Sequence, residues 1–73
     1  MKMYSQRLKE LREDNDLTQS DVAKVINTTY QYYSRYEKGI RELPLSRAIA
    51  LANFYNVSID YLAGVTDNPK RNK

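Results

Sequence analysis

Residues 17–39, LTQSDVAKVINTTYQYYSRYEKG, carry the signals of two short helices and the turn between them. Thr18 is a suitable N-cap for the first helix, and Asp21 three residues later completes a capping box. Leu17 before the cap and Val22 at the fourth helical position form a hydrophobic staple. These signals predict a helix that begins directly after Thr18.

A sharp turn and a second helix follow. Asn27 stands where a left-handed backbone conformation would turn the chain, and asparagine tolerates that conformation. Thr29 is a suitable N-cap for the second helix. A helical wheel places Tyr33 and Tyr36 on one face, which we expect to be buried, with Ile40 continuing toward the core. The side chains expected on or beside the outer face are Tyr30, Gln31, Tyr32, Ser34, Arg35 and Lys38.

Three further helices are expected. Ser5 is a plausible N-cap for a first helix with Tyr4, Leu8 and Leu11 on one face. A fourth helix follows Pro44, and Ser58 caps a short fifth helix that Gly64 ends. The residues of the fourth helix that follow the helical period are Leu45, Ala48, Ile49, Ala52 and Tyr55.

Composition narrows the functional classes. The chain has 73 residues, which predicts a single domain, and a net charge of +3 suggests a polyanionic partner. It contains no histidine, no cysteine and only two glycines, so the usual metal ligands, the commonest general base and a glycine-rich phosphate loop are missing. An enzyme is therefore disfavoured. We expect no cofactor, no bound metal, no membrane association and a cytoplasmic location.

The stretch 17–39 resembles the helix-turn-helix of the Cro/lambda-repressor-like (XRE-type) family of bacterial and phage transcriptional regulators. Residues 41–64, RELPLSRAIALANFYNVSIDYLAG, resemble the last two helices of that family. The resemblance covers roughly residues 5–64 and implies an all-α, compact five-helix, lambda-repressor-like DNA-binding domain. Three positions depart from the family pattern. Asn27 replaces the usual glycine, and Thr28 and Tyr33 replace the usual aliphatic residues. The Tyr33 hydroxyl must therefore find a hydrogen-bond partner or reach solvent.

The resemblance also implies domain boundaries. We expect the helix-turn-helix domain to span residues 1–65, with the helix-turn-helix at about 18–38. The recognition helix is expected at about 30–38, in the major groove. Residues 66–73 carry no large apolar side chain and are expected to form a flexible C-terminal tail.

The outer face of the recognition helix is the candidate base-reading surface. Glutamine bonds adenine bidentately and arginine does so to guanine, which favours Gln31 and Arg35. Taken alone, such a pair would more often be ordinary solvated residues. Tyr30 could equally contact a phosphate or a thymine methyl group, or simply shield the helix end. The predicted base contacts are Tyr30, Gln31, Ser34 and Arg35.

Phosphate contacts are expected on both sides of that face. The resemblance implies that Gln19 binds a phosphate and that the loop after the recognition helix touches the DNA backbone. Lys38 and Arg41 could instead be solvated charges, and Tyr32 could be a packing residue. The predicted phosphate contacts are Gln19, Thr29, Tyr32, Lys38 and Arg41.

The resemblance further implies an ion pair between Arg12 and Glu37. An exposed pair would contribute little, but Glu37 flanks the expected buried face, so partial burial is favoured.

A homodimer is expected, because one recognition helix reads few base pairs and two-fold pairing roughly doubles the binding free energy. The candidate interface residues are Phe54, Ile59 and Val65; the alternative is that they complete the small core.

Two functional hypotheses follow. The first is a sequence-specific transcriptional regulator, with repressor as the favoured direction, that binds a pseudo-palindromic operator in double-stranded DNA. The second is an antitoxin or other interaction module of a toxin–antitoxin or phage control system, whose tyrosine-rich face binds a regulatory or toxin protein. The two functions could coexist.

Overall fold

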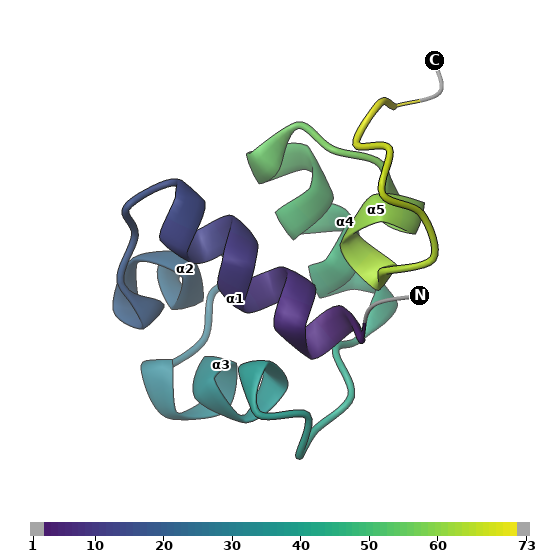
Figure 1. Ribbon diagram of the computed structural model, residues 1–73. Coiled ribbons are helices and arrows are strands. Elements are labelled where there is room, and N and C mark those ends of the chain that lie inside the picture. Colours follow the sequence, from purple (N-terminus) through teal and green to yellow (C-terminus); the bar gives the residue numbers. More distant parts are fainter. Residues whose placement is uncertain (1–2, 72–73) are drawn as a thin grey trace.

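Five helices make up the described part of the chain, which in the computed structural model is residues 3–71 (Figure 1). No strand occurs within these residues, and the all-α five-helix prediction is confirmed. In Figure 1, α1 crosses between the pair α2 and α3 and the pair α4 and α5. The helices are α1 (Tyr4–Asp14), α2 (Gln19–Val25), α3 (Tyr30–Glu37), α4 (Leu45–Tyr55) and α5 (Ile59–Ala63).

The ends of α2 and α3 follow the local signals. The Thr18 hydroxyl accepts from the backbone N–H of Asp21 at 3.1 Å, and the Asp21 carboxylate accepts from the backbone N–H of Thr18 at 2.9 Å. The pKa of Asp21 is lowered, mainly by the hydrogen bond that its carboxylate accepts from the Thr18 backbone and secondly by its hydrogen bond with the Thr18 side chain. Asn27 has a φ of 55°, and Thr29 accepts from the N–H of Tyr32. The predicted capping box, left-handed turn and N-cap are therefore all present.

The start of α1 differs from the prediction. Met3 occupies the N-cap position without a side-chain capping bond, and Ser5 lies inside the helix, where it is buried. Gly39, at φ 74°, approaches it: a Cβ added to Gly39 would lie 3.6 Å from the Ser5 hydroxyl oxygen. Ser5 is therefore a small packing residue under the end of α3 and not a cap.

Tyr33 lies at the centre of the core with no exposed surface, and Tyr36 is 4% exposed, as the wheel predicted. Ile40 was expected to continue this face and instead is 71% exposed. Gly39 ends the helical path and turns the chain away before Ile40. The buried apolar set is Leu8, Leu11, Val22, Ala23, Ile26, Tyr33, Tyr36, Leu51, Ala52, Val57 and Leu62.

The inner face of α4 also differs from the prediction. Leu51 and Ala52 are buried, whereas Leu45 and Ile49 are exposed. α4 packs against both α5 and α2, so the side of the helix that faces the core includes Leu51. The predicted helical period was right, but Leu45 and Ile49 were wrongly expected on the buried face of the helix.

The segment after α5 returns to the domain. The Asp67 carboxylate pairs with the Arg7 guanidinium at 2.8 Å, and the Pro69 carbonyl accepts from the backbone N–H of Ser58 at 3.1 Å. Arg7 is buried and stacks on the Tyr61 ring at 3.8 Å. Sequence reasoning did not anticipate these contacts. The flexibility of the segment stays a prediction, and residues 72–73 of the expected tail lie outside the described residues.

None of the five described helices is both long and apolar enough to cross a membrane. Within residues 3–71 there is also no cluster of three or more acidic side chains suited to a metal ion.

Candidate nucleic-acid interface

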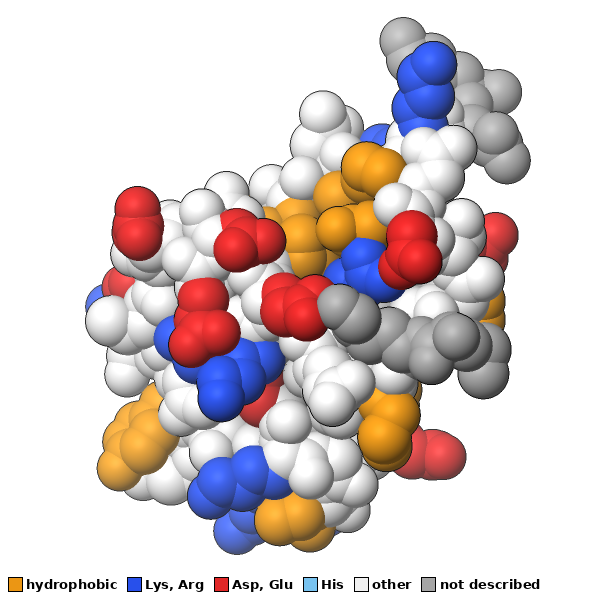
Figure 2. Space-filling model, viewed as in Figure 1, with side chains coloured by type: hydrophobic (Ala, Val, Ile, Leu, Met, Phe, Trp, Pro, Cys, Tyr) orange, Lys and Arg blue, Asp and Glu red, His pale blue; other side chains and the backbone are white. Residues whose placement is uncertain are grey.

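The outer face of α3 is open to solvent. Tyr30 is 53% exposed, Gln31 and Arg35 are exposed, and Ser34 is half-buried. Thr29, at the N-cap, is exposed as well. In Figure 2, basic and apolar side chains lie together at the lower end of the view, where Figure 1 shows α3, whereas several acidic side chains, with basic ones among them, lie in the region above it. The fold therefore presents the four predicted base contacts along one helix.

The loop after α3 is attached to the end of that helix. The backbone N–H groups of Ile40 and Arg41 both donate to the carbonyl of Arg35, at 3.0 and 3.4 Å. The Tyr4 hydroxyl of α1 donates to the carbonyl of Arg41 at 3.1 Å. Arg41 is consequently held beside α3, and Lys38 is exposed at the C-cap of α3.

Tyr32 brings the helix and this loop together. The centroid of its ring lies 5.1 Å from the guanidinium carbon of Arg35 and 5.8 Å from that of Arg41. The side chain is 44% exposed. A predicted base contact and a predicted phosphate contact thus share one aromatic ring.

Arg12 and Glu37 form a two-bond ion pair between α1 and α3. The Arg12 Nε donates to one carboxylate oxygen at 2.7 Å, and its Nη2 donates to the other at 3.2 Å. The side chains are only 15% and 4% exposed. The hydrogen bond to Glu37 is the main cause of the raised pKa of Arg12. A third N–H of Arg12 binds the Leu17 carbonyl at 3.0 Å, so α1, α3 and the start of α2 meet here.

Gln19 belongs to the same network. Its side-chain amide nitrogen donates to Glu37 at 3.3 Å, which uses one of its two N–H groups. Gln19 lies at the first position of α2 and is half-buried. The network therefore holds the amide beside α3, and its second N–H makes no hydrogen bond with another described residue.

Sequence reasoning missed Arg47 of α4. Its guanidinium donates to the Tyr36 hydroxyl at 2.6 Å, which places a further cation beside α3. Its first-turn position in α4 gave no signal of this contact, because the two residues meet only through the packing of separate helices.

Phe54, Ile59 and Val65 are 46%, 37% and 57% exposed. None of them belongs to the buried apolar set. Only Ile59 lines an apolar groove, described below.

Comparisons with known proteins agree with this geometry. A family model described as helix-turn-helix matches residues 8–62. The HTH-type transcriptional regulator YobD of Bacillus subtilis (strain 168) is 40% identical over 67 residues, which cover 92% of this chain and 60% of YobD. The cryptic phage CTXphi transcriptional repressor RstR of Vibrio cholerae is 39% identical over 57 residues, covering 78% of this chain and 51% of RstR.

A solved structure shows the same fold. The P22 c2 repressor, crystallised in complex with a synthetic operator, matches with a TM-score of 0.78 at 21% identity. The match covers 85% of this chain and 94% of the repressor chain. The present chain spans only about half to three fifths of the length of the two relatives named above.

Proposed function

The chain belongs to the helix-turn-helix family of transcriptional regulators, and from this premise we propose that it is a sequence-specific DNA-binding repressor. Members of this family are regulators and not enzymes, which agrees with the absence of histidine and cysteine from the sequence. The observation that carries the proposal is the exposed face of α3, with Gln31 and Arg35 pointing away from a core built on Tyr33. RstR and the P22 c2 protein are both repressors, which supports the repressor direction.

In the proposed complex, α3 enters the major groove and presents Gln31 and Arg35 to base edges. Gln19 on one side and Arg41 on the other contact phosphates, and such contacts set the register of the helix. The fold supports this arrangement because Glu37 holds the Gln19 amide and Tyr4 holds the Arg41 backbone. Tyr30, Ser34, Thr29 and Lys38 complete the proposed contact set.

Alanine variants should separate base readers from phosphate contacts. Gln31→Ala and Arg35→Ala are expected to relax preference at one base pair each, by about 1–3 kcal/mol. Gln19→Ala and Arg41→Ala are expected to weaken all sequences alike and to reduce the slope of affinity against salt. The measurement is selection of a preferred site from a random DNA library, followed by titration of single-base variants of that site at several salt concentrations. Indistinguishable profiles for the two pairs would contradict this assignment.

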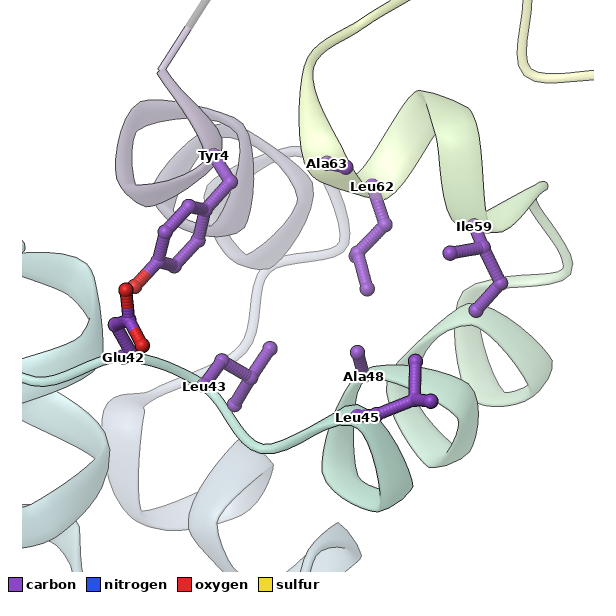
Figure 3. A pocket seen from close by; sticks show the side chains of 8 residues that line it. All are labelled: Tyr4, Glu42, Leu43, Leu45, Ala48, Ile59, Leu62 and Ala63. Atoms are coloured by element: carbon purple, nitrogen blue, oxygen red, sulfur yellow. The ribbon is translucent and has the colours of Figure 1, made fainter.

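We propose that the protein occupies its operator as a homodimer. An apolar groove of about 320 Å³ lies between α1, the loop after α3, α4 and α5 (Figure 3). Ile59, a candidate interface residue, lines this groove together with Leu45, which is 70% exposed. The groove supports Ile59 as a contact to a second copy and adds Leu45 to the candidates. Phe54 and Val65 lie outside its lining and remain candidates through their exposure alone.

Ile59→Asp should weaken dimeric occupancy, because a carboxylate would be buried against apolar side chains in the interface. On a selected operator we expect two chains per duplex for the unaltered protein, with half-sites roughly 34 Å apart. The variant should shift toward one chain per half-site with lower affinity, while its melting temperature changes little. Sedimentation of the protein–DNA complex gives the stoichiometry, and Asp60→Asn, an exposed change on the same helix, is the matched control. One chain on a tight, non-palindromic site, unaffected by the aspartate, would exclude the dimer.

A further inference from the structure

The Tyr32 ring lies near two arginine side chains, one from its own helix and one from the loop that follows. Its ring lies 5.1 Å from the Arg35 guanidinium carbon, on the same helix, and 5.8 Å from that of Arg41, in the loop. Both distances fall within the roughly 6 Å over which an aromatic face attracts a cation. The ring is 44% exposed, so filling the core does not account for its presence.

The backbone imposes this juxtaposition. Arg35 follows Tyr32 by three residues in α3, which places their side chains as neighbours on the helix surface. Arg41 is brought back to the same place because its N–H and that of Ile40 bind the Arg35 carbonyl. The Tyr4 hydroxyl then holds the Arg41 carbonyl from α1. The cluster therefore follows from a loop that is held at Arg41 by both α3 and α1.

We propose that Tyr32 is a positioning residue for DNA recognition, whose ring holds Arg35 for base reading and Arg41 for phosphate binding; this inference rests on the proposed function. Without the ring, the positively charged guanidinium groups of Arg35 and Arg41 would repel each other and move apart into solvent. Long arginine side chains also lose rotamer freedom when they bind, and a ring that restricts them beforehand reduces that loss. Specificity at the base pair read by Arg35 then depends on a residue that need not touch a base.

This role differs from a direct phosphate contact by the Tyr32 hydroxyl. A phosphate contact requires the hydroxyl, whereas positioning requires the ring. Tyr32→Phe removes only the hydroxyl, and Tyr32→Leu removes the ring while keeping an apolar side chain. The two variants therefore form a matched pair.

The first measurement uses the free protein and does not depend on DNA. The Arg35 and Arg41 side-chain NMR signals should be shifted by the ring current in the unaltered protein and in Tyr32→Phe. In Tyr32→Leu the side-chain signals of both arginines should move to the chemical shifts of a solvated arginine. Unshifted signals in the unaltered protein would overturn the inference even if the protein binds DNA as proposed.

The second measurement is titration of a selected operator and its single-base variants. Tyr32→Phe should bind within about twofold of the unaltered protein. Tyr32→Leu should lose about two- to fivefold in affinity for each arginine released, the factor corresponding to about 0.5–1 kcal/mol per exposed cation–π contact. It should also lose preference at the same base pair as Arg35→Ala.

Combined variants complete the test. Added to Arg35→Ala and Arg41→Ala together, Tyr32→Leu should have no further effect on affinity. A loss in Tyr32→Phe equal to that in Tyr32→Leu, with a reduced salt slope, would assign the role to the hydroxyl and overturn the inference. So would full affinity and specificity in Tyr32→Leu. Failure of the proposed function would look different, because the unaltered protein would then select no DNA sequence.

Discussion

Replacing Tyr33 by alanine is expected to destabilise the domain by about 3–5 kcal/mol, the range for truncating a fully buried aromatic side chain. Tyr33 has no exposed surface and is the largest fully buried side chain among the described residues. A domain of this size has only a few kcal/mol of stability from its single core. The variant should therefore be largely unfolded at 37 °C, as measured by circular dichroism during thermal and urea denaturation.

Tyr33→Phe provides the matched control, and the structure predicts the opposite result for it. The Tyr33 hydroxyl is buried and makes no hydrogen bond of standard geometry with the described residues, and the Glu37 carboxylate is the acceptor that lies near it. The carboxylate of the neighbouring Glu37 already accepts from Arg12 and Gln19. Burial of the hydroxyl raises the pKa of Tyr33 well above its ordinary value, and the nearby Glu37 carboxylate raises this pKa further. Removing this hydroxyl should leave the free energy of unfolding unchanged or raise it slightly.

Tyr30→Ala is the surface counterpart. Tyr30 is 53% exposed, so its truncation should change the free energy of unfolding by less than about 0.5 kcal/mol while lowering DNA affinity. A melting temperature that falls for Tyr30→Ala but not for Tyr33→Ala would contradict the assignment of inner and outer faces.

Glu37→Ala is expected to destabilise the domain by about 3 kcal/mol. The change leaves the Arg12 guanidinium, which is 15% exposed, without its carboxylate, and breaking a buried ion pair costs about 3–5 kcal/mol. We expect the lower end of this energy range because Arg12 retains some contact with water and keeps its hydrogen bond to the Leu17 carbonyl. Urea unfolding gives the value, and Glu13→Ala, which removes an exposed carboxylate from α1, is the control.

Replacing both members of the pair distinguishes a buried pair from a surface pair. Arg12→Met with Glu37→Leu should recover most of the stability lost by Glu37→Ala, because apolar side chains of similar size often match a buried ion pair. The double variant should still lose DNA affinity, since the Gln19 amide is no longer held. Single changes that each cost less than about 0.5 kcal/mol would show that the pair acts like an exposed one.

The local sequence determined where most helices begin and end. Thr18 with Asp21, and Thr29, act on backbone groups no more than three residues away, so their capping could be predicted without knowledge of the fold. Asn27 and Asn56 adopt positive φ, which is also a local effect because asparagine tolerates the left-handed conformation. The burial of Tyr33 and Tyr36 followed from helical periodicity once α3 had an amphipathic pattern.

Tertiary structure alone decided which of several periodic faces became the inner one. α4 carries apolar residues around much of its surface, and only its packing on α2 and α5 selected Leu51 over Leu45 and Ile49. Periodicity states which residues share a face, but a helix with two packing partners has no single direction to the core.

Tertiary structure also decided which charged and aromatic side chains meet. Arg47 reaches Tyr36, and Arg7 reaches Asp67 across 60 positions of the chain, because separate helices and the returning C-terminal segment bring them together. Arg41 reaches the Tyr32 ring because the loop folds back on the end of α3. The outward face of α3 could be predicted from the sequence, since it depends on residues within one helix. The contacts that position its side chains could not, since they depend on distances between segments that only the packed core sets.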